Sequence, residues 1–251
     1  QPFSGNPAAV VPLENWVEDD LMQRIAEENN LAETAFVVGS NGAYELRWFT
    51  PTIEVSLCGH ATLATTFVLH HILEDRSRKL QFQTKSGVLT AAVNAERIMM
   101  DFPADKLTSY TTNVGLVASA LGQTPVEIYQ GRDDLLCILQ DERQVEELSP
   151  DFRALSQIGG RGTIVTAASQ RDDRDITSRC FYPQSGIDED PVTGSAHTTL
   201  ATYWAPKMKL TTLTAYQASL RGGLLELQLT DDRVKLSGVA RLYLEGKIIV
   251  P

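Results

Sequence analysis

The chain has 251 residues, 43% of them hydrophobic and 22% charged, so it can bury one large core or two smaller ones and has no composition typical of disorder. Its formal net charge of −10, without a stretch rich in Lys and Arg, argues against a nucleic-acid partner, and no apolar run is long enough for a membrane span. Three cysteines without disulfide or metal-site spacing favour a reducing compartment, so the cytoplasm is the predicted location.

Strands outnumber helices in the predicted elements. A helix is expected at 17–29, followed by a hairpin of 35–38 and 44–50 around an Asn41-Gly42 turn, and then by a helix at 60–73. The remaining expected strands are 80–84, 88–93, 97–102, 135–140, 163–168, 176–182, 213–217, 224–229 and 233–244, and shorter helices are expected at 114–121, 151–158 and 197–204. Because the strands come in runs instead of alternating with helices, the pattern favours an α+β fold with antiparallel-rich sheets.

The chain also resembles itself. Three pairs of segments match in the same order, the first at an offset of 132 residues and the second at 137: Arg47–Pro51 with Arg179–Pro183, His60–Thr65 with His197–Thr202, and Phe82–Thr84 with Tyr216–Ala218. An ordered set of matches predicts an internal duplication. We expect two halves, 1–108 and 109–251, with a crossing at 103–113 and a final strand that can pair back to the first half.

Corresponding loop-to-helix junctions in the two halves are candidate anion sites. Gly59 lets the backbone approach a ligand, and the free amides at the start of the following helix bind an anion without a charged side chain. The counterpart in the second half is 190–196, which contains Gly194. Ordinary helix capping by Thr193 or Ser195 is the structural alternative.

Three side chains are candidate acids and bases. Glu33 is a lone carboxylate among apolar residues, so we expect it to be partly desolvated and suited to general-base catalysis, although an exposed loop carboxylate is the alternative. His60 can shuttle a proton near neutral pH or bond to helix backbone. Asp190 is the member of an acidic run that directly precedes the second junction. The other histidines are expected at the surface (His70, His71) or in a structural role (His197).

Cys58 lies at a helix start, where a thiol has a lowered pKa and can act as a base or nucleophile. The second half has no cysteine at the matching turn, where Asp190 stands, so a relay of two thiols is disfavoured. Cys137 and Cys180 fall within apolar strands and are expected to be buried and inert.

Together these segments resemble the phenazine-biosynthesis-like (PhzF-type) family, which is related in fold to diaminopimelate epimerase. The segments that carry the resemblance are Gln1–Val11, Ala32–Phe36, Phe49–Pro51, Cys58–Thr62, Met100–Pro103, Asp190–Ala196, Gln217 and Arg221–Gly223. The resemblance implies two pseudo-symmetric domains, each a curved, mostly antiparallel sheet around a central helix, with the site in the cleft between them. It assigns catalysis to Glu33, His60 and Asp190, and substrate contacts to Asn6, Cys58, Gly59, Ala61, Thr193, Gly194 and Ser195.

The activity that follows is a cofactor-independent isomerisation without a metal. Glu33 would take a proton from a carbon next to an unsaturated or carbonyl group and return it elsewhere on a small substrate that bears a carboxylate. A homodimer is the expected assembly. Two other functions stay open: an amino-acid or hydroxy-acid racemase or epimerase that uses Cys58, and a non-catalytic small-acid-binding or protein-interaction module.

Overall fold

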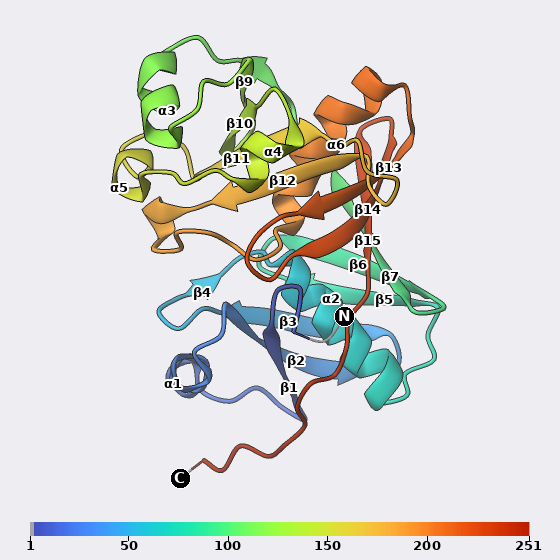
Figure 1. Ribbon diagram of the computed structural model, residues 1–251. Helices are drawn as coiled ribbons and strands as arrows, with labels where there is room; N and C mark the ends of the chain where they lie inside the picture. Colours follow the sequence, from blue (N-terminus) through green and yellow to red (C-terminus); the bar gives the residue numbers. More distant parts are fainter. Residues whose placement is uncertain (1–2, 251) are drawn as a thin grey trace.

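The computed structural model describes residues 3–250, and in this part of the chain 15 strands form one continuous sheet that curls around two central helices (Figure 1). The central helices are α2 (Gly59–Phe67) and α6 (Gly194–Met208). The strands of the first half are β1 (Ala8–Leu13), β2 (Glu33–Ser40), β3 (Ala43–Phe49), β4 (Glu54–Val55), β5 (Lys79–Thr84), β6 (Gly87–Asn94) and β7 (Arg97–Pro103).

The remaining strands and the smaller helices complete both halves. These strands are β8 (Thr108–Ser109), β9 (Glu127–Gln130), β10 (Asp134–Ile138), β11 (Gly162–Ala168), β12 (Ile176–Phe181), β13 (Thr212–Gln217), β14 (Gly223–Thr230) and β15 (Arg233–Gly238). The smaller helices are α1 (Asp19–Asn29), α3 (Val114–Leu121), α4 (Glu142–Glu146) and α5 (Phe152–Leu155), with a π-helical turn at Val68–Ile72 and a 3₁₀ turn at Pro183–Ser185.

Two sets of six strands have the same connectivity. In the first set β1 pairs with β2 in parallel, β2 with β3 antiparallel, β3 with β5 in parallel, and β5, β6 and β7 antiparallel in turn. The second set, β10 to β15 in chain order, repeats this series of parallel and antiparallel pairings. In each set the central helix lies between the third and fourth strands of the series along the chain. This repetition confirms the internal duplication.

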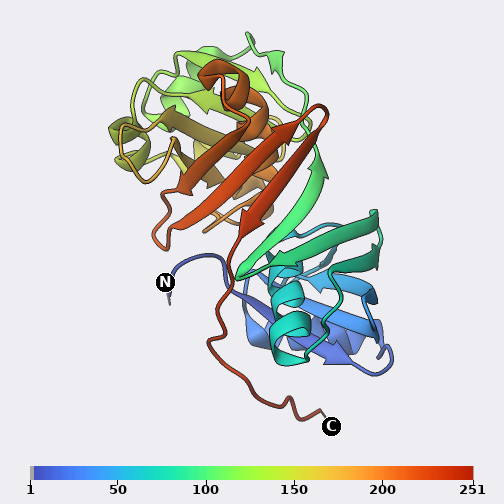
Figure 2. The same cartoon turned by 90° about the vertical axis from the view of Figure 1, so that its right-hand side faces the viewer.

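The two halves are joined by the antiparallel pair β7 and β15, in which Met100 lies opposite Leu236. Figure 2 shows one lobe on each side of these strands. The α+β prediction, with a curved sheet around a helix in each half, is therefore confirmed.

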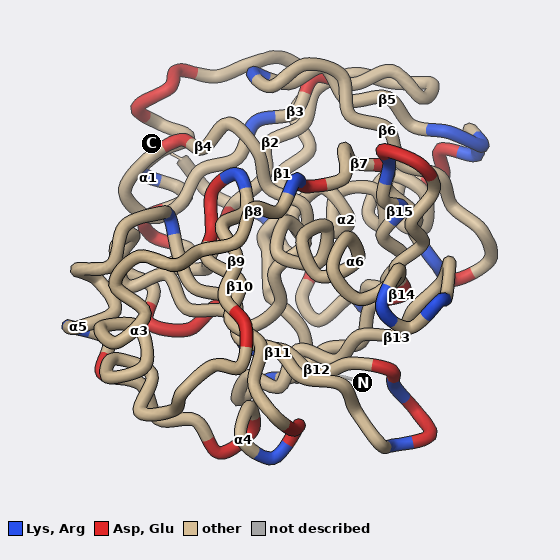
Figure 3. Tube along the Cα trace, turned by 90° about the horizontal axis from the view of Figure 1, so that it is seen from above, with Lys and Arg blue, Asp and Glu red and all other residues tan. Residues whose placement is uncertain are grey.

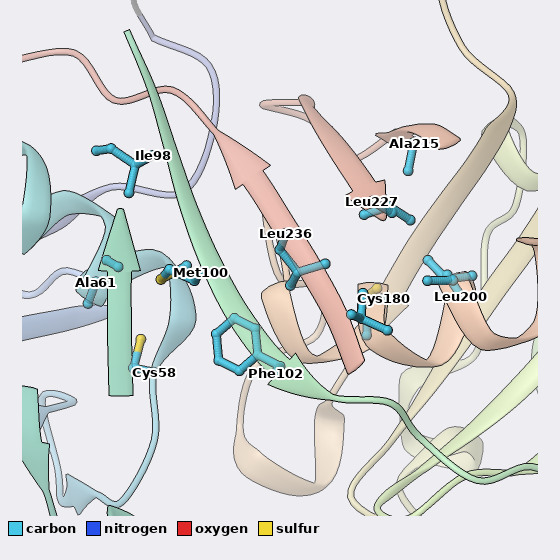
Figure 4. Packing of buried hydrophobic residues seen from close by; sticks show 14 of the residues in the cluster. Cys58, Ala61, Ile98, Met100, Phe102, Cys180, Leu200, Ala215, Leu227 and Leu236 are labelled. Carbon is cyan, nitrogen blue, oxygen red and sulfur yellow. The ribbon is translucent and has the colours of Figure 1, made fainter. Parts of the chain in front are cut away.

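Successive side chains of a strand point to opposite faces of the sheet, and in the first half both faces are buried. In β2, Ala35 and Val37 belong to the cluster that packs against α2, whereas Phe36 packs with Phe49 on the opposite face, near α1. The first cluster runs through both halves. Figure 4 shows Phe102 and Leu236, from the two joining strands, between the Cys58 side and the Cys180 side of this core.

Several predicted boundaries were wrong. The last strand ends at Gly238, and residues 239–250 form neither strand nor helix, so the expected extension to residue 244 does not occur. The helix expected at 197–204 begins three residues earlier and ends at Met208, while the helix expected at 151–158 covers only Phe152–Leu155. The strands β1 and β9 and the helix α4 were not predicted, because Pro12 and polar residues interrupt their apolar pattern.

No helix in residues 3–250 combines the length and apolar character needed to cross a membrane. Basic and acidic residues are scattered over the chain trace, without a basic face in this view (Figure 3).

Candidate active site

The starts of the two central helices meet. A Cβ atom built on Gly59 would lie 3.7 Å from the Cα of Gly194, and one built on Gly194 would lie 3.7 Å from the Cα of Gly59. The residues that precede these glycines, Cys58 and Thr193, occupy the N-cap positions, and neither side chain caps its helix. The capping alternative for Thr193 is therefore wrong, and the first amides of α6 are left for other acceptors, as are those of Gly59 and His60 in α2.

The structure corrects the register between the two helices. The Thr62 hydroxyl donates to the Cys58 carbonyl at 2.6 Å, and the His197 ring contacts the Thr193 carbonyl at the same distance. Both contacts link the N-cap residue to the residue four positions later. Cys58 thus corresponds to Thr193 at an offset of 135 residues, and the match of His60 with His197 was two residues out of register. The true counterpart of His60 is Ser195.

Glu33, His60 and Cys58 form a row at the start of α2. The Glu33 Oε2 lies 3.1 Å from His60 Nε2, and the other ring nitrogen, Nδ1, lies 3.5 Å from Cys58 Sγ. The Glu33 and His60 atoms are shielded from solvent, and their contact is short enough for an ion pair without being aligned as a hydrogen bond. Burial lowers the pKa of His60, but Cys58 and Glu33 outweigh it and hold this pKa well above its usual value.

The thiol of Cys58 is not activated in the way its position suggested. Burial raises its pKa above the usual value and outweighs the opposing effects of His60 and the Ala61 amide. The sequence-based expectation of a lowered pKa is therefore wrong, because the helix start is enclosed by the core and not open to solvent. A neutral thiol at this position is a weak nucleophile.

A metal ion is the other use for this row, since one ligand atom from each of Glu33, Cys58 and His60 lies within 4.8 Å of the others. The His60 ring stands between the two partners, with one nitrogen toward each. A single ion can bind only one of these nitrogens, whereas protons can use both. Proton transfer along this row would therefore use both ring nitrogens of His60, whereas a metal centre would use only one.

Asp190 reaches the site from the loop before α6. Its carboxylate accepts hydrogen bonds from Asn6 Nδ2 at 2.9 Å and from the Thr193 hydroxyl. Gln217 holds the same loop, because its side-chain amide donates to the Asp190 carbonyl at 2.7 Å and its oxygen accepts from the Thr193 amide at 2.8 Å. Burial raises the pKa of Asp190, although His60, Thr193 and Asn6 oppose the increase. Asp190 is therefore easier to protonate than an aspartate in solvent.

The matching family model, described as phenazine biosynthesis-like protein, covers residues 1–246. An uncharacterised isomerase of Pseudomonas aeruginosa is 51% identical over 247 residues, which cover 98% of this chain and 94% of the relative. A phenazine biosynthesis protein of the PhzF family from Enterococcus faecalis has a crystal structure with a TM-score of 0.93 and 44% identity, covering 100% of this chain and 95% of that one. This chain belongs to the phenazine biosynthesis-like family.

Membership of the phenazine biosynthesis-like family fixes the broad activity. Curated relatives that match nearly the whole chain are named isomerases, so the protein is an enzyme of the isomerase class and not merely a binding module. A predicted epimerase of Pseudomonas aeruginosa, 21% identical with a TM-score of 0.77 and covering 100% of this chain and 96% of that one, shares the fold. The recognition of the family and of the epimerase-like fold is thereby confirmed.

The other predicted site residues lie at or near the two helix starts, in different settings. Asn6, Gly59, Thr193 and Gly194 lie at the meeting of the helix starts or bond to Asp190. Ser195 lies in the first turn of α6, where its hydroxyl accepts a hydrogen bond from Arg161 at 3.1 Å. Ala61 has a fully buried side chain in the core, so only its backbone amide can serve a ligand. The sequence analysis did not assign Gln217 a role, although it lies in the third repeated segment.

The remaining histidines have structural settings. His197 is fully buried, as its structural role required, and burial lowers its pKa to about 4. His71 is exposed as predicted, but His70 is half-buried and contacts the Asp75 carbonyl at 2.8 Å, so its prediction as a surface residue was wrong. Cys137 and Cys180 are buried as predicted.

A hollow of about 590 Å³ lies away from these groups. It is lined by residues of β1, β2, β3, the π-helical turn and the 73–77 loop, and none of the candidate catalytic residues borders it. Of the two acidic residues in its wall, Glu74 and Asp75, the second already accepts hydrogen bonds from Tyr44 and the Gly42 and Ser77 amides. By contrast, the buried atoms without hydrogen-bond partners include Asn6 Oδ1, Glu33 Oε2 and His60 Nε2, all at the meeting of the helices.

Proposed function

We propose that this isomerase moves a proton between two positions of a small carboxylate-bearing substrate by general acid and base catalysis, without a cofactor. The observation that carries the proposal is the contact of 3.1 Å between Glu33 Oε2 and His60 Nε2, beside the two facing helix starts. A carboxylate beside an imidazole can accept a proton from carbon, and nearby amides can stabilise the negative charge that this removal creates.

The proposed reaction has two steps, removal of a proton from one carbon and its return to another, and each step is assigned to named groups. Glu33 takes a proton from a carbon next to an unsaturated or carbonyl group, and the electron pair of that C–H bond becomes part of a shifted double bond. Protonated Glu33 then returns a proton to another carbon of the substrate, and this proton can be one that the carboxyl group has exchanged with solvent. The amides near Gly59 and Gly194 hold the substrate carboxylate and the developing charge, while His60 and Asp190 orient the substrate and assist proton transfer. Removal and return of one proton leave the composition of the substrate unchanged.

Access to the site requires a motion of the protein. The relevant atoms of Asn6, Glu33 and His60 are shielded from solvent, and they lie where residues of the two halves meet. We expect the halves to open for substrate entry and to close for reaction, which excludes water from the proton being moved.

The test is exchange in deuterated water. The enzyme is incubated with a panel of unsaturated and 2-substituted carboxylic acids, and deuterium incorporation is measured by mass spectrometry. Glu33→Gln should lower the exchange rate by about a hundredfold to ten-thousandfold, because this is the usual contribution of a general acid or base to a reaction rate. Glu28→Gln, the same change at an exposed position of α1, should leave the rate unchanged. Exchange that persists in Glu33→Gln would remove Glu33 from this role.

One observation favours a second candidate, a racemase or epimerase that uses Cys58 with Glu33 or Asp190 as its second base. The Cys58 Sγ contacts His60 Nδ1 at 3.5 Å, so a proton could pass between them. Against it stands the raised pKa of Cys58, because a thiol that stays protonated is a poor base. We therefore place the Glu33 mechanism first.

The proposal also covers the oligomeric state, the cellular location and the domain boundaries of the enzyme. We propose a homodimer in the cytoplasm, supported by the prevalence of two-fold symmetry among soluble oligomers and by three free cysteines. We also propose residues 1–108 and 109–251 as the two halves. Size-exclusion chromatography with light scattering tests the dimer, since a mass near that of one chain would contradict it.

A further inference from the structure

Tyr182 has a buried hydroxyl group without a hydrogen-bond partner among residues 3–250. The residue is 7% exposed and directly follows β12. Tyr44 is buried to a similar degree, at 9% exposed, but its hydroxyl donates to Asp75 at 2.6 Å. Burying an unpaired hydroxyl is unfavourable, so the Tyr182 group requires an explanation that the Tyr44 group does not.

The duplication shows which residues of the first half correspond to Tyr182 and its neighbours. Thr34 pairs with Phe49 in the first half, and Thr163 pairs with Phe181 in the second. One residue further along, Glu33 and Thr50 in the first half therefore correspond to Gly162 and Tyr182 in the second. A Cβ built on Gly162 would overlap the Tyr182 ring. The ring thus fills, in the second half, the space that belongs to the Glu33 side chain in the first.

The neighbours of Tyr182 place it beside the start of α6. Cys180, two residues earlier on the same face of the sheet, is next to Thr193, whose hydrogen bond lowers the pKa of the Cys180 thiol against the larger effect of burial. The Arg161 guanidinium lies 5.4 Å from the centre of the Tyr182 ring and donates to the Ser195 hydroxyl. Ser195 is the counterpart of His60, and Arg161 connects it to Tyr182, because the guanidinium contacts both the Tyr182 ring and the Ser195 hydroxyl.

Arg161 itself is not available for a substrate anion. Its guanidinium forms two hydrogen bonds with the carboxylate of Asp134, whose side chain is buried, so its charge is already balanced. The phenol differs, since burial raises the pKa of Tyr182 well above its usual value and keeps the hydroxyl protonated. Tyr182 is therefore a neutral donor with an unused proton.

We propose that Tyr182 determines substrate specificity by donating a hydrogen bond to a second oxygen of the substrate, across the site from Glu33. This inference rests on the proposed function, since Glu33 and the helix starts define the site. The substrate class it names is a carboxylic acid that carries a further hydroxyl or carbonyl oxygen. A site with an unpaired buried donor discriminates strongly against the analogue that lacks the acceptor.

The first test needs no substrate. Tyr182→Phe removes only the hydroxyl, so we expect its melting temperature to equal or exceed that of the unchanged protein. Tyr44→Phe is the matched control, and loss of its hydrogen bond to Asp75 should lower the melting temperature by a few degrees. If Tyr182→Phe lowers the melting temperature as much as Tyr44→Phe does, the Tyr182 hydroxyl has a partner inside the protein and the proposal is overturned.

The second test measures binding with pairs of acids that differ by one hydroxyl, such as malate and succinate, added to a thermal unfolding assay. The unchanged protein should bind the hydroxylated member of at least one pair about tenfold to a hundredfold more tightly, and Tyr182→Phe should abolish that preference. A preference that survives in Tyr182→Phe, or the absence of a preference across the panel, would overturn the proposal.

Glu33→Gln separates this inference from the proposed function. It should retain the binding preference, because the hydroxyl of Tyr182 is untouched, while it loses deuterium exchange. In exchange assays Tyr182→Phe should raise KM for the hydroxylated acid more than it lowers kcat, as expected for a binding contact made in both ground and transition states. A loss confined to kcat would contradict a specificity role. Exchange that survives in Glu33→Gln would instead contradict the catalytic role of Glu33.

Discussion

The two halves of the molecule share one backbone plan but carry different chemistry at the starts of their central helices. In the first half the N-cap is Cys58, the second helical residue is His60, and the neighbouring strand supplies Glu33. The second half has Thr193 and Ser195 at the matching helix positions. The duplicated fold thus provides two equivalent helix starts, and in the proposed mechanism the differences at a few positions make one side a proton-transfer group and the other a set of neutral donors.

Asp190 stands outside this correspondence. It lies on the loop that leads into α6, and it is held by Asn6 from the opposite half and by the backbone contacts of Gln217. The position at the matching offset in the first half is Val55, which is apolar. The asymmetry of the site therefore comes from a loop as well as from the helix starts, which is how duplicated scaffolds commonly diverge in function.

The correspondence between the two halves is tested most strongly at Gly162, the counterpart of Glu33, by giving it a side chain. In Gly162→Ala the new Cβ would overlap the Tyr182 ring and lie 2.6 Å from the Phe181 carbonyl oxygen, so backbone must move. We expect a loss of more than about 3 kcal/mol in the free energy of unfolding, at or above the usual range for overpacking. Chemical denaturation measures it.

Gly159→Ala is the matched control for this variant. No atom outside its chain neighbours lies within 4 Å of a Cβ built on Gly159, so stability should change by only about 0.5 kcal/mol or less. Equal stability of the two alanine variants would show that the Tyr182 ring does not fill the space above Gly162, and the correspondence with Glu33 would fail.

The helix interiors offer a second contrast, because His197 corresponds to the uncharged Thr62. Burial lowers the folded-state pKa of His197 to about 4, below its unfolded value of 6.5. Above pH 6.5 the residue is neutral in both states and its contribution is complete. As the pH falls from 6.5 to 4, only the unfolded state binds the proton, so the folded state should lose about 3 kcal/mol from this group.

The measurement is the free energy of unfolding of the unchanged protein and of His197→Gln across this pH window. The glutamine can still donate to the Thr193 carbonyl but does not titrate, so the variant should lose about 3 kcal/mol less than the unchanged protein on acidification. His71→Gln, at an exposed position, controls for loss of a histidine. Parallel curves for the protein and His197→Gln would contradict the buried, neutral state of His197.

The duplication and most of the strands could be predicted from sequence because they depend on local alternation and on repeated motifs. Gly59 and Gly194 were correctly matched as helix starts, since their loop motifs can be recognised without coordinates. The pairing of His60 with His197 failed because both segments repeat small residues and threonines, so a shift of two residues costs little in the comparison. Only hydrogen bonds to the N-cap carbonyls fix the register.

The sequence analysis could not predict how strongly burial changes the pKa of a side chain. A helix start lowers the pKa of a thiol in solvent, but the core around Cys58 reverses the direction. Gln217 and Tyr182 went unassigned for a related reason. Gln217 acts on the Asp190 loop through backbone groups, and the unused hydroxyl of Tyr182 becomes visible only when every neighbour is in place. Long-range contacts of this kind leave no periodic signal.

The smallest predicted effect concerns Cys58, and it separates the two candidate mechanisms. If Glu33 is the base, Cys58→Ser should lower kcat/KM for exchange by about tenfold or less, since only a neutral contact with His60 changes. Cys137→Ser, another buried thiol whose pKa burial raises to about 12, controls for the cost of burying a serine hydroxyl.

The racemase mechanism predicts a different result, because a serine cannot replace a thiolate as the acid or base and the loss should reach about a thousandfold. Alkylation by iodoacetamide adds an independent measurement. The raised pKa and burial of Cys58 predict slow modification of the folded protein near neutral pH. Rapid alkylation that a substrate acid prevents would instead identify a reactive thiolate, and the first half would then owe its chemistry to its N-cap residue and not to the carboxylate beside it.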